Sequence, residues 1–181
     1  EDNSWTNWSG YNISTGDLDN DGLTEIYTVA FDFYHVIVFE NTLANEYEYQ
    51  TDFYVSSEAF EYGNQSIIIT DINRDGSNEL FAATSGTKDG ETLLAPGKLY
   101  GAGDINDVSL LTFSDFNYFA SYQGGLRQIA TGDADNDGNS NLYLAGHYDE
   151  SLYDWEFVGQ DPVDVSHLSL IHISEPTRQS L

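Results

Sequence analysis

The stretch GDLDNDGLTEIYTVA (residues 16–30) decides the fold, because it recurs as TDINRDGSNELFAAT (70–84) and GDADNDGNSNLYLAG (132–146). In each copy an isoleucine lies four residues before the first aspartate, and an apolar pair follows the acidic stretch. The first aspartates are separated by 54 and 62 residues, which is typical of architectures that copy one supersecondary unit. The sequence therefore predicts three copies of a strand, a tight acidic loop and a second strand.

The residues between the copies predict further strands, because they are rich in β-branched and aromatic residues. These segments are 34–41, 47–56, 97–103, 108–116, 151–160 and 163–170. We find no apolar stripe at helical spacing bounded by caps. The pattern predicts an all-β fold of three β-propeller blades, each with about four antiparallel strands. Because a propeller ring needs about four to eight blades, we expect a fragment of a larger propeller, with six to eight blades in the whole ring.

The domain prediction divides the chain at residue 168. Residues 1–168 are expected to form the partial propeller, with calcium loops at 17–25, 71–79 and 133–141. Residues 169–181 contain only one acid and so differ in composition from the rest of the chain. They are expected to form a final strand plus tail, or a non-native or disordered extension. The chain starts at Glu1 and has no visible signal peptide, so we expect an internal fragment of a longer protein.

The charge balance limits the partners. The chain has 31 Asp plus Glu against 5 Lys plus Arg, for a net charge of −26. Such a surface repels nucleic acid and anionic lipid and attracts cations. No run of 18 apolar residues exists, so no membrane insertion is expected. The absence of cysteine excludes disulfides and thiolate ligands.

The three acidic loops share a nine-position pattern, numbered from the first aspartate. Oxygen-bearing side chains occupy positions 1, 3, 5 and 9, and glycine occupies position 6, where a positive φ would turn the chain back. Such alternate side chains can converge on one hard cation, and calcium suits a cage of about 6–8 oxygens. Magnesium remains an alternative, but it prefers fewer protein oxygens and more water. The loops contain no Cys or His, which argues against zinc or copper.

Two other interpretations fit the loops less well. An EF-hand requires a glutamate at position 12 and flanking helices, whereas position 12 here is Thr28, Ala82 or Leu144 and the flanks are β. Solvated turns rich in Asp and Asn would explain a single loop. They explain three loops with one shared pattern less well. Position 7, which is Leu23, Ser77 or Asn139, is expected to offer its backbone carbonyl to the ion.

This pattern, D-x-[DN]-x-D-G-x-x-[EN] before an apolar strand, resembles the FG-GAP or VCBS repeat, the calcium-loop blade of integrin-α-like propellers. The resemblance implies up to three calcium ions. The side-chain ligands that it implies are Asp17, Asp19, Asp21 and Glu25; Asp71, Asn73, Asp75 and Glu79; and Asp133, Asp135, Asp137 and Asn141. Asn73 and Asn141 each remove a charge, so the first site is expected to be the tightest and the other two weaker.

The resemblance also implies a function. We expect a calcium-binding, secreted or cell-surface module with a structural, adhesion or ligand-binding role, and no enzyme activity. Its expected partners are the remaining blades or domains of the same polypeptide and an extracellular protein or carbohydrate. The alternative is an accessory, non-catalytic propeller of a secreted enzyme acting on polysaccharide or lipid. A catalytic ring with its site in the central channel is a third hypothesis.

Overall fold

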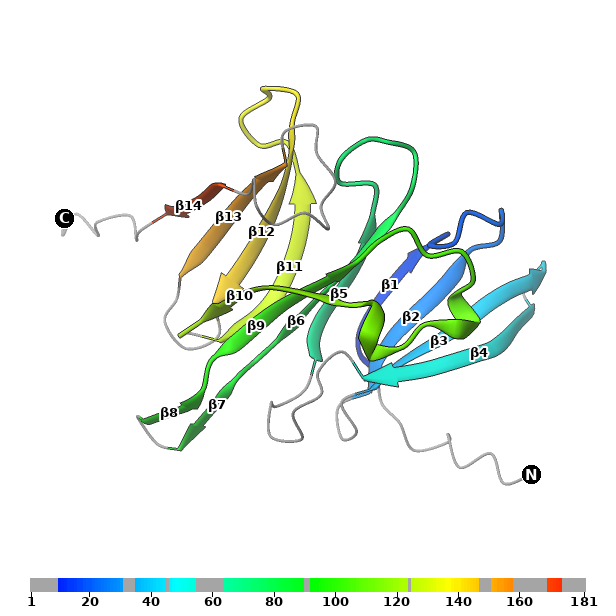
Figure 1. Cartoon of the computed structure of the whole chain (residues 1–181), viewed down its shortest axis with the longest axis horizontal. Coiled ribbons are helices and arrows are strands. Elements are labelled where there is room, and N and C mark those ends of the chain that lie inside the picture. The colour runs from blue at the N-terminus through cyan, green and yellow to red at the C-terminus, as the bar shows by residue number, and fades with distance from the viewer. Residues whose placement is uncertain are drawn as a thin grey trace.

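The computed structural model describes residues 10–30, 35–44, 46–54, 64–89, 92–123, 125–146, 151–157 and 169–173. These residues form three four-stranded antiparallel sheets, which we name the first, second and third blade (Figure 1). The first blade contains β1 (Gly10–Gly16), β2 (Glu25–Ala30), β3 (His35–Leu43) and β4 (Glu46–Tyr54). The second contains β5 (Asn64–Thr70), β6 (Glu79–Thr84), β9 (Gly97–Ala102) and β10 (Asn117–Tyr122). The third contains β11 (Leu126–Gly132), β12 (Ser140–Gly146), β13 (Leu152–Phe157) and β14 (Ser169–Ile173).

In every blade, strands consecutive along the sheet run antiparallel, and the described residues contain no α-helix. The all-β prediction, with about four strands in each of three repeats, is therefore confirmed. β14 pairs with β13, so residues 169–173 complete the third blade, as expected for the alternative in which residues 169–181 begin with a final strand. No helix in the described part of the chain is long and apolar enough to cross a bilayer.

The segment 108–116 was predicted to be a strand, and that prediction is wrong. It forms two 3₁₀ turns, η2 (Val108–Leu110) and η3 (Phe113–Asp115), and the fourth strand begins only at Asn117. The Asp107 carboxylate caps the first turn by accepting a hydrogen bond from the Ser109 amide at 3.0 Å. The Asp115 carboxylate accepts another from the Thr112 amide at 2.7 Å. These local side-chain bonds compete with pairing in a sheet. Val108, Leu111 and Phe116 are therefore buried without belonging to a strand, whereas Leu110 is exposed.

A small hairpin between β6 and β9 was also not predicted. It pairs β7 (Thr87–Asp89) with β8 (Thr92–Ala95) and extends away from the second blade (Figure 1). The hairpin explains why β6 and β9, which are neighbours in the sheet, are not consecutive in sequence.

Two hydrophobic cores fill the spaces between neighbouring blades. The first lies between the first and second blades and includes Tyr27, Val29, Val38, Phe53, Leu80, Ala82, Tyr100, Val108 and Phe116. The second lies between the second and third blades and includes Phe81, Ala83, Leu99, Tyr122, Leu142, Leu144, Tyr153, Trp155 and Phe157. Alternate residues of β6 thus enter different cores, which explains why all six residues of this strand are buried.

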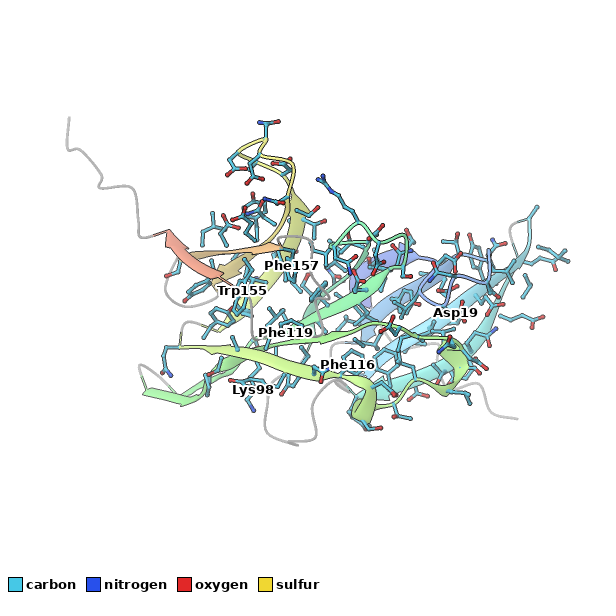
Figure 2. All side chains as sticks on the ribbon, turned by 45° about the horizontal axis from the view of Figure 1, so that its top comes forward. Asp19, Lys98, Phe116, Phe119, Trp155 and Phe157 are labelled. Atoms are coloured by element: carbon cyan, nitrogen blue, oxygen red, sulfur yellow. The ribbon has the colours of Figure 1, made fainter. Side chains whose placement is uncertain are left out.

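Aromatic contacts show the same division. The rings of Phe53 and Phe116 are 5.3 Å apart in the first core. Phe119 instead packs edge-on against Phe81, with ring centroids 5.8 Å apart, on the side that faces Phe157 (Figure 2). Each blade therefore depends on its neighbour for the burial of one or both faces.

The first strands of the three blades, β1, β5 and β11, lie side by side at the centre of the arrangement (Figure 1). Side chains of one strand accept hydrogen bonds from backbone amides of the next. Asn12 Oδ1 accepts from the Ile67 amide at 3.1 Å, and Ser66 Oγ accepts from the Ile129 amide at 3.1 Å. Asn12 and Ser66 both lie five residues before the first aspartate of their loops, so the repeat reproduces the contact between blades.

Replacing Ser66 by alanine is expected to lower the free energy of unfolding by about 1–3 kcal/mol, because the buried Ile129 amide would lose its acceptor. Denaturant unfolding measures this loss. Ser121→Ala is the matched control, because Ser121 is exposed in β10 and its replacement should cost less than about 0.5 kcal/mol. Equal effects of the two variants would contradict a role for Ser66 in joining the blades.

Candidate metal centre

Each acidic loop joins the first strand of a blade to its second strand, and the three loops have the same backbone conformation. Position 6 is a glycine with φ of 92°, 97° and 96° in Gly22, Gly76 and Gly138. Position 4 is also left-handed, with φ of 57°, 61° and 60° in Asn20, Arg74 and Asn136. The positive φ expected for the loop glycines is confirmed. Glycine at position 6 reaches it without the steric cost that a side chain would add.

The aspartates at positions 1 and 5 close the loops through hydrogen bonds. In the first loop, Asp17 accepts from the amides of Asp21 at 3.1 Å and Gly22 at 3.0 Å. Asp21 in turn accepts from the Leu23 amide at 2.7 Å. Equivalent bonds hold the second and third loops. Turn chemistry therefore accounts for these two acids. At position 3, Asn73 and Asp135 also accept from the position-5 amide of their own loops, at 2.9 and 3.2 Å. Asp19 of the first loop instead accepts from the Val108 amide, outside its loop.

In the first loop four carboxylates converge. Asp17, Asp19, Asp21 and Glu25 each offer one oxygen, and these four oxygens lie within 4.8 Å of one another. Four like charges at this separation repel strongly unless a cation or a proton lies among them. This cluster could hold a metal ion.

Glu25 is the member of the cluster most in need of a partner, because its side chain is fully buried, with 0% of its surface exposed. One oxygen, Oε2, accepts hydrogen bonds from the Leu18 amide and the Tyr27 hydroxyl, both at 2.8 Å. Burial raises the pKa of the Tyr27 hydroxyl, so it remains a donor. The other oxygen, Oε1, is buried and has no hydrogen-bond partner among the described residues. A buried carboxylate oxygen without a partner is costly, and a metal ion would satisfy it.

Asp19 repeats this arrangement at position 3. Its Oδ2 accepts a hydrogen bond from the Val108 amide at 3.0 Å, and its Oδ1 is buried with no partner in the described part of the chain. Val108 begins η2, in the connection between β9 and β10 of the second blade, and Asp19 lies at the edge of the first blade close to that segment (Figure 2). The first loop is therefore fastened to the neighbouring blade by a residue of its own acidic cluster.

The pKa of Glu25 is raised from 4.5 to about 7, because burial removes water and the charges of Asp19 and Asp17 add to the effect. The hydrogen bonds from Leu18 and Tyr27 lower this pKa but do not offset the burial. In the absence of a bound cation, the folded protein therefore holds a proton that the unfolded chain has already released above about pH 4.5.

We therefore expect the ion-free protein to lose stability as pH rises from about 5 to 8. The stabilisation from protonated Glu25 is complete below the unfolded pKa and is lost as pH rises through about 7. Melting temperatures measured in chelator across this range test the prediction, and saturating calcium should flatten the profile. An ion-free melting temperature that rises steadily from pH 5 to 8 would contradict it.

The second loop differs from the first. Glu79 Oε2 accepts from the Ile72 amide at 2.9 Å, as Glu25 does from Leu18. The Asn73 amide, however, donates to Asp75 Oδ2 at 2.8 Å instead of leaving that carboxylate free. Among the described residues, groups of three or more converging carboxylates occur in the first loop (four) and the third loop (three) but not in this one. The structure thus places Asp71, Asn73, Asp75 and Glu79 in one loop without gathering their acids as closely.

The third loop brings together Asp133, Asp135 and Asp137, whose oxygens lie within 4.8 Å of one another. Asn141, at position 9, is 4% exposed. Its Nδ2 donates to Asp154 Oδ1 at 2.9 Å, and its Oδ1 is buried with no partner among the described residues. Asn139 donates from Nδ2 to Asp137 at 2.9 Å and to Glu156 at 3.1 Å. This cluster could also hold a metal ion.

Neighbouring loops also contact one another. Asn78 of the second loop donates from Nδ2 to the Asp17 backbone carbonyl at 2.8 Å. Arg74 of the second loop donates to the carbonyl of Gly138 and, at 3.3 Å, to Ser140 Oγ, both in the third repeat. The sequence did not indicate these contacts. Position 8 differs in all three loops, and Arg74 stands where the other two loops have an asparagine.

The sequence analysis also missed three residues that bond to the predicted ligands. Tyr27 donates a hydrogen bond to Glu25, whereas Asp154 and Glu156 accept from Asn141 and Asn139. Tyr27 could have been found, since a tyrosine follows position 9 by two residues in both the first and third repeats. The predicted use of the carbonyls of Leu23, Ser77 and Asn139 stays a prediction. No protein-family model matches the chain, and no curated protein matches it, so the chemistry of the loops rests on their own geometry.

Proposed function

We propose that the chain is part of a secreted, calcium-binding β-propeller of the FG-GAP/VCBS kind, with a structural, adhesion or ligand-binding role and no catalytic one. The observation that carries this proposal is the buried, unpartnered Oε1 of Glu25 in a cluster of four converging carboxylates. A stable fold tolerates such an oxygen when a ligand satisfies it.

The donor set favours calcium. The clustered groups are carboxylates, which suit hard cations, and the chain contains no cysteine. Calcium accepts 6–8 oxygens in flexible geometry, so four side chains, a backbone carbonyl and water can complete its shell. Magnesium would require a more regular arrangement of about six ligands and would retain more of its water.

The proposed role of the ion is structural. The first cluster takes three acids from the loop after β1 and the fourth, Glu25, from the start of β2. Asp19 in addition binds the second blade through the Val108 amide. An ion at this point would hold two strands of one blade and the adjoining blade in a fixed relation. Exposed loop residues such as Asp21 indicate modest affinity, which suits the high calcium concentration outside cells.

We also propose that further blades of the same polypeptide cover the outer faces of the first and third blades. Ile67 and Ile129 lie four residues before their loops and are 3% and 8% exposed, because each packs beside the preceding blade. Ile13 occupies the same place in the first blade and is 66% exposed. A preceding blade would bury it. The completed ring would then present its surface to an extracellular protein or carbohydrate.

Thermal unfolding with and without calcium tests the proposed function. Calcium at a hundredfold excess over Kd should add about 2.7 kcal/mol for each filled site, or about 5–10 °C in Tm for one site. Chelator should reverse the shift, and equal magnesium should produce a smaller one. A Tm that calcium leaves unchanged would overturn the proposal of structural calcium sites.

A further inference from the structure

We propose that Asp154 is a positioning residue of the third loop: it aims the side-chain carbonyl of Asn141 at the bound cation and supplies the negative charge that position 9 lacks. This inference rests on the proposed calcium binding. It also changes the expectation from sequence, in which Asn141 weakens the third site. With Asp154 in place, the third site should bind calcium with an affinity close to that of the first.

The hydrogen bond between the two side chains fixes the orientation of the amide. An ionised carboxylate only accepts hydrogen bonds, so the group of Asn141 that faces Asp154 must be the NH₂. The carbonyl oxygen of Asn141 then has to point away from Asp154.

The oxygen turned away from Asp154 is the one that lacks a partner. Asn141 Oδ1 is buried and receives no hydrogen bond from the described residues, as is true of Glu25 Oε1 in the first loop. Both atoms belong to position 9 of their loops, and Glu25 demonstrably converges with its loop acids. Asn141 is 4% exposed, so leaving this oxygen empty would be costly.

In the third repeat an acid stands on the neighbouring strand, and position 9 of the loop has none. Asp154 lies opposite Tyr143 in the pairing of β12 with β13. The residue opposite Tyr27, which is equivalent to Tyr143, is Val38 in the first blade. An acid at this place therefore accompanies the loss of the acid at position 9, one hydrogen bond away.

The hydrogen bonds around position 9 are rearranged accordingly. In the first loop Glu25 accepts from the Leu18 amide and the Tyr27 hydroxyl. In the third loop the equivalent amide, that of Ala134, donates to the Tyr143 hydroxyl at 3.3 Å. Asn141 is thus relieved of both donors, and its orientation depends on Asp154.

The test is a calcium titration followed by the backbone amide resonances of Gly22 and Gly138, each of which reports its own loop. Asp154→Val, which installs the residue of the first blade, should weaken binding at Gly138 by about 10- to 100-fold and leave Gly22 unchanged. The double variant Asn141→Glu with Asp154→Val restores the arrangement of the first loop and should recover the affinity. A purely structural role of Asp154 would not give this rescue.

Two further variants keep the test decisive. Asp154→Asn conserves size, so it should fold and weaken the third site in the same direction even if the valine variant does not. Asp104→Asn is the control for loss of one negative charge, at a left-handed residue (φ 55°) outside the loops. It should leave the calcium concentration at half-saturation unchanged for both the Gly22 and the Gly138 resonance. Unchanged affinity at Gly138 in the Asp154 variants would overturn the inference. No calcium response at any loop of the natural sequence would instead overturn the proposed function.

Discussion

Replacing Glu25 by glutamine should abolish calcium binding at the first loop and yet leave the ion-free protein as stable as before, or more stable, at pH 8. Glutamine keeps the size of the side chain and a carbonyl oxygen that can accept from Leu18 and Tyr27. Its NH₂ would then take the place of Oε1, where the cation requires an acceptor. Calcium affinity at this loop should fall at least about 100-fold, since a direct ligand has a larger effect than its supporting residues.

In chelator the substitution should not destabilise the protein, because the pKa of the Glu25 carboxyl is raised. At pH 8 the carboxyl of Glu25, with a pKa of about 7, is ionised in a fully buried position among other acids. The neutral amide removes that unfavourable charge. The measurement is the melting temperature of the natural protein and of the Glu25→Gln variant at pH 8. In chelator the variant should melt at the same temperature or higher, and in saturating calcium it should melt at a lower temperature.

Glu40→Gln is the matched control for this experiment. Glu40 lies opposite Glu25 in the pairing of β2 with β3, but it is not one of the four converging acids. Its replacement by glutamine also removes one negative charge near the cluster. It should retain calcium binding. A Glu25→Gln variant that binds calcium at the first loop as the natural sequence does would contradict the assignment of Glu25 as a ligand.

Gly97→Ala should cost at least about 3 kcal/mol of unfolding free energy. An added Cβ at Gly97 would lie 2.6 Å from the Gly125 Cα, the Leu126 nitrogen and the Thr84 oxygen. All three are backbone atoms, so a change of side-chain rotamer cannot relieve the clash. The start of β9 would have to move away from the start of the third blade. Overpacking against backbone atoms is one of the few mechanisms by which a single substitution greatly lowers the free energy of unfolding.

Gly132→Ala provides the control for Gly97→Ala. Gly132 precedes the third loop, and an added Cβ there has no heavy atom within 4 Å. Denaturant unfolding should show a change of less than about 1 kcal/mol for this variant. Similar stabilities of the two alanine variants would contradict the close packing of the second blade against the third.

The sequence predicted those parts of the fold that the repeat determines. The strands flanking the loops, the left-handed glycines and the converging acids of the first loop all follow from one short pattern that recurs three times. β3 and β4 were also predicted within a few residues, because the dense β-branched and aromatic residues there have no competing local structure.

The failures lie where the structure depends on contacts distant in sequence or on local capping. The segment 108–116 has the composition of a strand, but Asp107 and Asp115 turn it into two short helical turns. The same segment supplies the Val108 amide to Asp19, 89 residues away, and no periodic pattern signals such a bond. Asp154 was not found because it acts across the sheet through Asn141.

Anomalous diffraction from crystals grown in calcium tests the central claim most directly. The account predicts an anomalous peak in the first loop about 2.3–2.6 Å from oxygens of Asp17, Asp19, Asp21 and Glu25, and another in the third loop beside Asn141. A well-ordered structure in millimolar calcium whose first loop contains only water, with the Glu25 carboxyl bonded to protein through both oxygens, would contradict it.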